Sequence, residues 1–329
     1  MAQDKLSPAA RPPHTGPAPD DSGRMPRSRR GDYLLTAVIG VVVPPLTLAL
    51  TGMTSQAVAA GQLPHIALFA LSTLLVSALT QWLFAARSSL GGVVAGGVAL
   101  LAQVVILTRP GHAAAAPFGW ARALIPTGAV LIVAALLLGG SWGMRRARRA
   151  GRADARLSVR LGANDKTPGL TPAAPPSRRR DHMISLILTV AATGTALALI
   201  SGGYAQLVAP GALPLGALLA SVLALVLLLL GTALTGRSTL GARTTGLLLL
   251  LFSVPSLLGQ VWPRLPGRGL LTSLFPHDPT GAGLLLTGTL LVATGWGAHL
   301  ARREGRAREL AELRFRETPT PPHGLPRTP

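Results

Sequence analysis

The sequence predicts an all-α integral membrane protein of about eight transmembrane helices, arranged as two parallel four-helix repeats. Three observations support this prediction. Of the 329 residues, 49% are apolar and only 13% are charged, whereas roughly 25% are charged in a typical soluble domain. The charged residues gather at both termini and in one central stretch, and long neutral segments lie between them. In addition, the second half of the chain copies the first.

The basic residues indicate how the chain is oriented. Of the 31 Lys and Arg residues, 27 lie on one predicted side of the membrane, in the two tails, the central stretch and two short turns. The other side carries only Arg109, Arg122, Arg264 and Arg268. Because Lys and Arg accumulate on the cytoplasmic side, we predict that both termini are cytoplasmic. The composition, rich in Ala, Arg, Gly and Pro and free of Cys, is typical of a high-GC bacterium and predicts a plasma-membrane location.

The first half begins with a polar tail. Residues 1–30 carry Pro, Arg, Asp and Ser without apolar periodicity, so we expect a disordered cytoplasmic tail. Residues 31–150 form the first predicted four-helix repeat. Its apolar runs are each about long enough to cross a hydrocarbon core of roughly 30 Å, and they predict spans at 33–53, 65–86, 90–108 and 122–143.

A basic segment joins the two halves. Residues 151–180 are rich in Arg and Pro and form a predicted cytoplasmic linker, whose first part can extend the preceding helix. Residues 181–303 form the second repeat, with predicted spans at 183–201, 214–236, 240–262 and 280–300. Residues 304–329 form a cytoplasmic C-terminal tail. The part of this tail up to Glu317 mixes Arg and Glu with Leu and Phe, and it predicts a helical extension that docks a partner, lies on the membrane or is simply solvated.

The duplication is visible at an offset of 150 residues, at which the chain aligns with itself without a gap from Arg29 to Leu90. Seven of the thirteen residues in 52–64 are identical to their counterparts in 202–214. With small length changes, the Pro-Thr-Gly-Ala sequence at 126–129 recurs at 279–282. Because each copy holds four spans, an even number, both copies run the same way through the bilayer, about an axis along the membrane normal.

Gln103 and Gln260 are the deepest polar side chains that recur in both halves, within the matching sequences LLAQV and LLGQV. An amide in lipid needs a hydrogen-bond partner, and such an interhelical bond is worth roughly 1–2 kcal/mol in model peptides. One hypothesis is that the two amides face each other, or a ligand, near the axis between the repeats. The alternative is that each amide bonds a neighbouring helix, and nothing beyond the recurrence favours the ligand.

Two further sets of residues recur in kind. Gln56 and Gln206 lie in the first outer loop of each half, where they hold turns or line a ligand or partner site. The predicted helix breaks are Pro44, Pro45, Gly194 and Pro255. The two successive prolines remove the amide donors to the carbonyls of residues 40 and 41, so we expect a kink there. Interrupted helices at matching positions indicate a transporter site, although Pro and Gly also shape ordinary membrane helices.

The predicted spans lack the groups that membrane chemistry needs. None has an Asp, Glu or Lys in its interior, which disfavours proton relays, ion-coupled carriers and intramembrane proteases. The segment 139–143 matches GxSxG, but it lies at the end of a membrane helix rather than in a strand-turn-helix. The chain has no Cys, and His65, His112 and His277-Asp278 lie on separate outer segments. We therefore predict no enzymatic activity, no metal site and no cofactor.

Two functional hypotheses remain. The first is a non-enzymatic membrane component, such as a scaffold, a sensor or a complex subunit, that binds proteins or lipids. The alternative is a carrier or permease for neutral or amphiphilic cargo that uses the interface between the repeats. The predicted partners are membrane lipids, with anionic headgroups at the cytoplasmic Arg clusters, and other membrane proteins. Nucleic acid is not a predicted partner, because aromatic residues make up only 4% of the chain.

Overall fold

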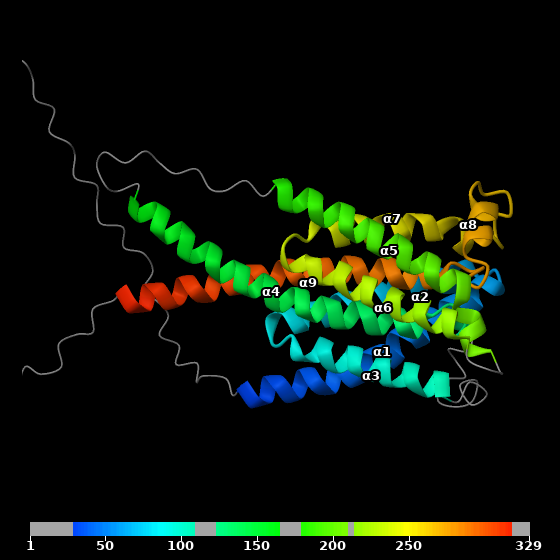
Figure 1. Ribbon diagram of the computed structural model, residues 1–329, viewed down its shortest axis with the longest axis horizontal. Helices are drawn as coiled ribbons and strands as arrows, with labels where there is room; N and C mark the ends of the chain where they lie inside the picture. Colours follow the sequence, from blue (N-terminus) through cyan, green and yellow to red (C-terminus); the bar gives the residue numbers. More distant parts are fainter. Residues whose placement is uncertain (1–28, 109–122, 165–178, 210–213, 318–329) are drawn as a thin grey trace, which may run out of the picture.

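The computed structural model describes residues 29–108, 123–164, 179–209 and 214–317. Within these ranges the regular secondary structure is entirely helical, and eight helices are long and apolar enough to cross a membrane (Figure 1). The number of apolar spans that the sequence predicts is therefore confirmed. Most of the predicted N-terminal tail, the Pro-rich part of the linker, the loop that carries His112 and the last part of the C-terminal tail lie outside the described residues.

The long helices match the predicted spans in order. The first four are α1 (Arg29–Ala59), α2 (Leu63–Ala86), α3 (Leu90–Thr108) and α4 (Ala129–Asn164). The next four are α5 (Arg179–Val208), α6 (Leu215–Ala233), α7 (Leu240–Leu257) and α9 (Ala282–Glu317). Two short helices complete the fold, the 3-10 turn η3 (Leu234–Gly236) after α6 and the seven-residue α8 (Arg268–Leu274), which the apolar pattern does not predict.

The helix ends differ from the ends of the apolar runs. α4 and α9 each have 36 residues and continue well past the apolar part of their sequences, because the Arg, Ala, Glu and Leu residues that follow are good helix formers. The first part of the predicted linker is therefore helical up to Asn164, and the start of the predicted C-terminal tail is helical up to Glu317. In contrast, α7 ends at Leu257, earlier than its apolar run, where Gly259 and Pro263 follow and favour a helix end.

α4 and α9 lie at the centre of the bundle and pack along each other. α3 and α6 pack against α4, whereas α2 and α7 pack against α9. α1 contacts both α2 and α3, and α5 contacts both α6 and α7. As a result, 78% of the apolar window is buried in α4 and in α9, compared with 28–39% in the six surrounding helices.

The six surrounding helices expose a broad apolar surface. Large aliphatic side chains face outward along each of them, including Val38, Leu71, Leu101, Ile187, Leu219 and Leu251. Soluble monomers rarely expose contiguous apolar patches larger than a few hundred Å². The outer surface of this bundle is therefore unlike that of an ordinary soluble domain.

Glycine permits the close crossings inside the bundle. A Cβ atom at Gly96 of α3 would lie 2.9 Å from the backbone nitrogen of Leu138 in α4. A Cβ atom at Gly246 of α7 would lie 2.8 Å from the backbone nitrogen of Val292 in α9. Small residues let the backbones of membrane helices approach closely, so both crossings require glycine at these positions.

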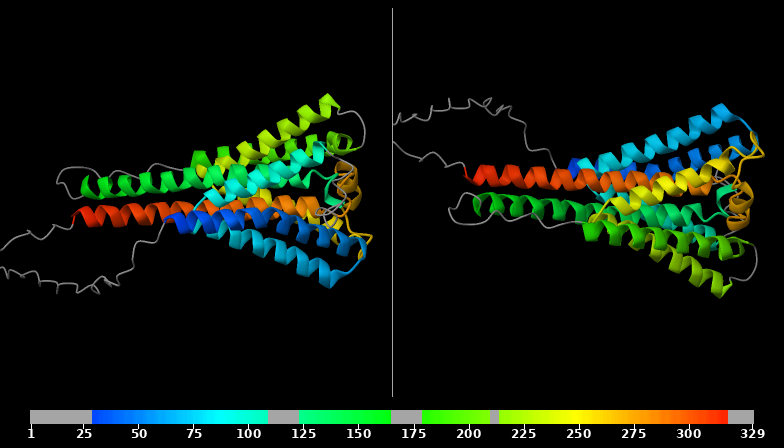
Figure 2. Two further views of the ribbon diagram at one scale, coloured as in Figure 1. Left: turned by 90° about the horizontal axis from the view of Figure 1, so that it is seen from below. Right: turned by 90° about the horizontal axis from the view of Figure 1, so that it is seen from above.

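The two ends of the bundle differ in shape (Figure 2). α2 and α6 diverge from the central axis toward the end that carries α8. At the opposite end, α4 and α9 both continue past the other helices, and their tips diverge from each other in Figure 1. This projecting pair is the most distinctive feature of the fold.

Candidate functional site

The candidate functional site is the projecting helix pair, here called the stalk, which comprises residues 148–161 of α4 and residues 302–315 of α9. Two glycines bring its helices together. A Cβ atom at Gly151 would lie 3.0 Å from the carbonyl carbon of Arg302, and a Cβ atom at Gly305 would lie 3.0 Å from that of Arg148. Neither position has room for a side chain, because the obstacle is backbone. The two helices are therefore closely packed at the base of the stalk, and they diverge toward their tips (Figure 1).

Ion pairs between α4 and α9 set the register of the stalk. The Arg302 Nε donates to Asp154 Oδ2 at 2.9 Å, and the Arg156 Nε donates to Glu309 Oε1 at 2.6 Å. The Glu309 side chain is only 6% exposed, and the Arg302 and Asp154 side chains are 23% and 25% exposed. Removing the arginine of either pair would therefore leave a largely buried carboxylate without this counterion. Both pairs also fix which faces of the two helices meet.

The base of the stalk is anchored to the bundle by arginines. The Arg148 Nη2 donates to the carbonyl of Phe84 at 2.9 Å and also to the carbonyl of Ala85. The Arg302 Nη1 donates to the carbonyl of Arg237 at 3.3 Å. Carbonyls at helix C-termini have no partner within their own helix, so these arginines satisfy them. The direction of the stalk is consequently fixed relative to the bundle.

One face of the stalk is strongly basic. Arg149, Arg152, Arg156 and Arg160 recur at helical spacing on α4 and surround a groove of about 430 Å³ together with Leu157. Apolar side chains are also exposed on the stalk, and Phe315 of α9 is 84% exposed. A surface that combines positive charge with exposed apolar groups suits an acidic, partly apolar partner.

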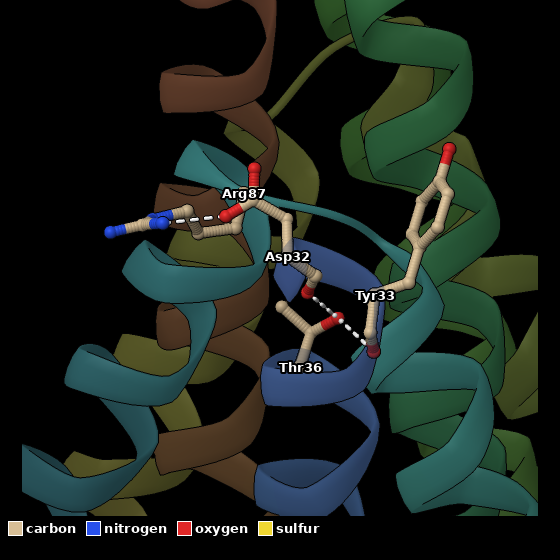
Figure 3. A network of polar contacts seen from close by, with 4 residues as sticks. All are labelled: Asp32, Tyr33, Thr36 and Arg87. Atoms are coloured by element: carbon tan, nitrogen blue, oxygen red, sulfur yellow. Dashed lines mark hydrogen bonds and ion pairs between the residues drawn. The ribbon is translucent and has the colours of Figure 1, made fainter. Parts of the chain in front are cut away.

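A second polar network ties the start of α1 to the turn between α2 and α3 (Figure 3). The Arg87 Nη1 donates to Asp32 Oδ1 at 2.5 Å. The Thr36 hydroxyl donates to the carbonyl of Asp32 at 2.8 Å and lies 3.2 Å from that of Tyr33. This network closes the end of the bundle from which the stalk leaves.

The second half contains a similar arrangement. The Arg237 Nη2 lies 3.7 Å from Oδ1 of Asp181, which is at the start of α5. The backbone N–H of Leu240 donates to the Ser238 hydroxyl at 3.2 Å, just as that of Leu90 donates to the Ser88 hydroxyl at 3.1 Å. The recurring Arg-Ser sequence thus makes the same type of turn in both halves.

Gln103 is buried within the bundle and bonds a neighbouring helix. Its Oε1 accepts a hydrogen bond from the Tyr204 hydroxyl of α5 at 2.8 Å, and its Nε2 has no partner among the described residues. Sequence reasoning did not identify Tyr204, although the chain has only two Tyr residues. A buried Tyr hydroxyl usually needs a hydrogen-bond partner, so a Tyr within a predicted span was the feature of the sequence that could have indicated a partner for Gln103.

Gln260 lies in a different environment from Gln103. It is exposed in the turn after α7, whereas Gln103 is inside α3. The residue at the depth of Gln103 in α7 is Ser253, which is buried and donates to the carbonyl of Leu250 at 2.7 Å. Gly96 of α3 and Gly246 of α7 both make close crossings, but LLGQV begins further along the chain from Gly246 than LLAQV does from Gly96, so Gln260 falls beyond the helix end. The two amides do not share one site.

We expect Gln103→Leu to lower the free energy of unfolding by little more than Tyr204→Phe does. The interhelical bond is worth about 0.6 kcal/mol on average and at most about 1.7 kcal/mol in a membrane protein, and either change removes it. Gln260→Leu should leave stability unchanged, because its side chain is exposed. Unfolding of the three variants in detergent would measure these differences. A large loss of stability in Gln260→Leu would contradict its placement.

The predicted outer-loop pair lies on helices rather than in loops. Gln56 is in the last turn of α1 and Gln206 is in the last turn of α5, and both side chains are exposed. The apolar pattern ends earlier than the helices do, which is why these residues were placed in loops. The segment 109–122, another predicted outer loop, lies outside the described residues.

The predicted helix breaks do not interrupt their helices. α1 continues through Pro44 and Pro45, where the Thr47 hydroxyl donates to the carbonyls of Val43 and Pro44 at 3.0 Å. α5 is likewise continuous through Gly194. Pro255 lies inside α7, which ends two residues later. The Thr47 hydroxyl bonds the carbonyls of residues 43 and 44 rather than those of 40 and 41, which the two prolines leave without an amide donor. Packing against neighbouring helices accommodates proline within membrane helices, and none of the described helices is interrupted in the way that indicates a transporter site.

At the end opposite the stalk, the Asp278 carboxyl lies at the N-terminus of α9. Its Oδ2 accepts a hydrogen bond from the backbone N–H of Leu284 at 3.1 Å, whereas its buried Oδ1 has no partner among the described residues. An adjoining cavity of about 30 Å³ lies against Thr127 and Ile200 and is large enough for about one water molecule. Burial raises the pKa of the Asp278 carboxyl above its usual value, although backbone hydrogen bonds oppose this shift.

This shift predicts a pH dependence of stability. Because the folded-state pKa of Asp278 is raised, its contribution to stability is complete below the unfolded value of about 3.9 and is lost as the pH rises through the folded value. Asp278→Asn keeps an oxygen acceptor for Leu284 but cannot ionise. We therefore expect the free energy of unfolding to fall with rising pH more steeply in the wild type than in Asp278→Asn. Parallel curves from denaturant titrations would contradict this expectation.

The Ser141 hydroxyl of the GxSxG match has a structural role. It is buried and donates to the carbonyl of Ser89 at 2.7 Å, which joins α4 to the start of α3. Among the described residues, no group of three or more His, Asp or Glu side chains is placed to hold a metal ion.

Comparison of this chain with known protein families, with curated proteins and with solved structures finds no match.

Proposed function

We propose that this chain is a multi-pass membrane protein that acts as a non-enzymatic component, in the manner of a scaffold, sensor or complex subunit, by presenting the stalk to a protein partner in the cytoplasm. One observation carries the proposal. The two most buried helices of the bundle, α4 and α9, continue beyond it as a basic pair that is closely packed at its base. A rigid projection at the axis of a bundle is suited to hold a protein partner or to transmit a movement to it.

Membrane placement is supported by the outer surface. Each of the six surrounding helices exposes large aliphatic side chains, and lipid tails are the solvent that such a surface requires. The excess of Lys and Arg at the stalk end and in both tails supports a cytoplasmic location for that end. A bacterial plasma membrane is the location that the composition favours.

The arrangement as two parallel repeats is supported by matched contacts. α3 meets α4 at Gly96 and Leu138, and α7 meets α9 at Gly246 and Val292. The glycines of both Pro-Thr-Gly-Ala sequences, Gly128 and Gly281, adopt positive φ of 71° and 69°. Each half also exchanges a contact with the other, since α2 packs on α9 and α6 packs on α4. These pairings are those expected of a pseudo-twofold axis between α4 and α9.

The carrier alternative requires a pathway between the repeats. In the described part of the chain, that interface is filled by α4 and α9. Residues 129–137 of α4 are at most 5% exposed, and Leu284, Leu286, Leu290 and Leu291 of α9 are at most 3% exposed. A cavity that touches Ile132 of α4 and Leu284 of α9 holds only about 30 Å³. This dense packing favours the component over the carrier.

Site-specific photo-crosslinking in cells would test the proposal. A photoreactive residue at Leu157 or at Phe315 samples the stalk, and one at Leu71 samples the apolar outer face as a matched control. We expect the stalk positions to capture one defined protein in stoichiometric amount, whereas Leu71 captures none. If no stalk position captures a protein and the purified chain moves neutral solutes across liposomes, the carrier alternative replaces the proposal.

A further inference from the structure

A groove lies at the base of the stalk, between α3, α4 and α6. Its volume is about 420 Å³. The apolar floor consists of Val93 of α3, Leu138 of α4 and Leu229 of α6. The floor is therefore built from three helices, whereas the rim comes from α4 alone.

The rim of the groove is basic and carries one aromatic ring. Arg145, Arg146 and Arg149 line it together with Trp142. The Arg146 guanidinium lies 5.4 Å from the centre of the Trp142 ring. The Arg145 Nε donates to the Ser89 hydroxyl at 3.2 Å, which holds this side chain beside the groove. Among the described residues, none of these three arginines makes an ion pair with a carboxylate.

The position of the groove along the bundle axis indicates that it lies at the membrane–water interface. Arg145 touches the turn between α2 and α3 through Ser89, and Arg146 packs against Gly236 at the end of η3. The groove is thus at the depth where the surrounding helices end. Trp142 is 51% exposed there, as expected of a Trp that lies at the membrane–water interface.

We propose that this groove is a binding site for one anionic phospholipid, with the phosphate held by Arg146 and Arg149 and an acyl chain laid over Val93 and Leu229. The proposal rests on the membrane placement in the proposed function. Basic pockets between membrane helices on the cytoplasmic side bind anionic headgroups, and guanidinium groups match phosphate geometry. The apolar floor beneath the arginines favours a lipid over a free phosphate, because only the lipid has an acyl chain that can cover the floor.

The second half does not repeat the arginine cluster. At the same spacing after Trp296, the positions of Arg145 and Arg146 are taken by His299 and Leu300, and only the position of Arg149 keeps an arginine, Arg303. The proposed site is therefore single, and one tightly held lipid is expected per chain.

The test measures lipid binding to the purified full-length chain by native mass spectrometry. Phosphatidylglycerol and phosphatidylcholine with identical acyl chains serve as probes. We expect the double variant Arg146→Gln/Arg149→Gln to bind phosphatidylglycerol about thirtyfold more weakly than the wild type, since each arginine near the surface contributes about one fivefold factor. Arg152→Gln/Arg160→Gln removes the same charge from the stalk groove and should change the affinity by less than about twofold.

Three outcomes would overturn the site. The first is an equal loss in both double variants, which would mean diffuse attraction to the whole basic surface. The second is competition by glycerol 3-phosphate as strong as that of the intact lipid, which would leave the apolar floor without a role. The third is no preference for phosphatidylglycerol in the wild type. Circular dichroism of both variants would verify folding. Photo-crosslinking at Leu157 probes the stalk alone, so it distinguishes failure of the lipid site from failure of the protein-partner proposal.

Discussion

Replacing Gly96 by leucine will destabilise the bundle strongly, whereas the same replacement at the adjacent Gly97 will not. A Cβ at Gly96 would meet the backbone and side chain of Leu138, but a Cβ at Gly97 has no atom within 4 Å. Overpacking usually costs about 1–3 kcal/mol, and here the obstacle includes backbone, which cannot change rotamer. We therefore expect a loss of about 3 kcal/mol or more for Gly96→Leu, measured by unfolding in detergent.

Gly246→Leu should show a loss of the same size. A Cβ at Gly246 would lie 2.7 Å from the carbonyl oxygen of Gly288 and 2.8 Å from the backbone nitrogen of Val292. Gly194 offers a control in the second half, because it is exposed and a Cβ there has open space. Equal tolerance of Gly96→Leu and Gly97→Leu would show that α3 does not cross α4 at this point. A severe effect at only one of Gly96 and Gly246 would contradict the matched crossings of the two proposed repeats.

The second large effect is expected in the stalk. Gly151→Leu or Gly305→Leu places a side chain against the backbone of the opposite helix, so the two helices must separate by roughly the width of that side chain. Packed helix axes lie about 8–10 Å apart, and a separation of several Å breaks both ion pairs between α4 and α9. We expect crosslinking of the protein partner to be lost while the rest of the bundle remains folded.

Spin labels would measure this separation directly. The chain has no Cys, so Leu157→Cys and Ala311→Cys, both exposed, introduce the only two labelling sites. Electron–electron distances between the labels should lengthen in Gly151→Leu. Arg152→Leu is the matched control, because Arg152 is the exposed neighbour of Gly151 on the same helix. An unchanged distance in Gly151→Leu would mean that the stalk helices are not in contact at this glycine.

The candidate site was only partly predictable. The helical extension of α9 to Glu317 was predicted because its Arg, Glu and Leu residues are good helix formers. The pairing of that extension with α4 was not, since it depends on Gly151 and Gly305 meeting across a sequence separation of more than a hundred residues. The alignment of Gln103 with Gln260 did not predict their positions, because a short sequence match does not fix how far along a helix a residue lies.

The number, order and approximate positions of the long apolar helices follow from the sequence alone. Hydrocarbon or a protein interior is the only surrounding in which such runs are stable, and the backbone must then satisfy its own hydrogen bonds as a helix. The charge distribution likewise follows from the sequence, because it is a sum over residues that needs no neighbours.

Only the tertiary structure decided which side chains meet. Tyr204 reaches Gln103 from another helix, Arg148 reaches the end of α2, and Glu309 lies against Arg156. These contacts depend on how the helices cross, and the crossings are set by the glycines that let α4 and α9 approach their neighbours. A periodic apolar pattern specifies that a helix has a buried face, but close packing of particular backbones specifies what that face touches.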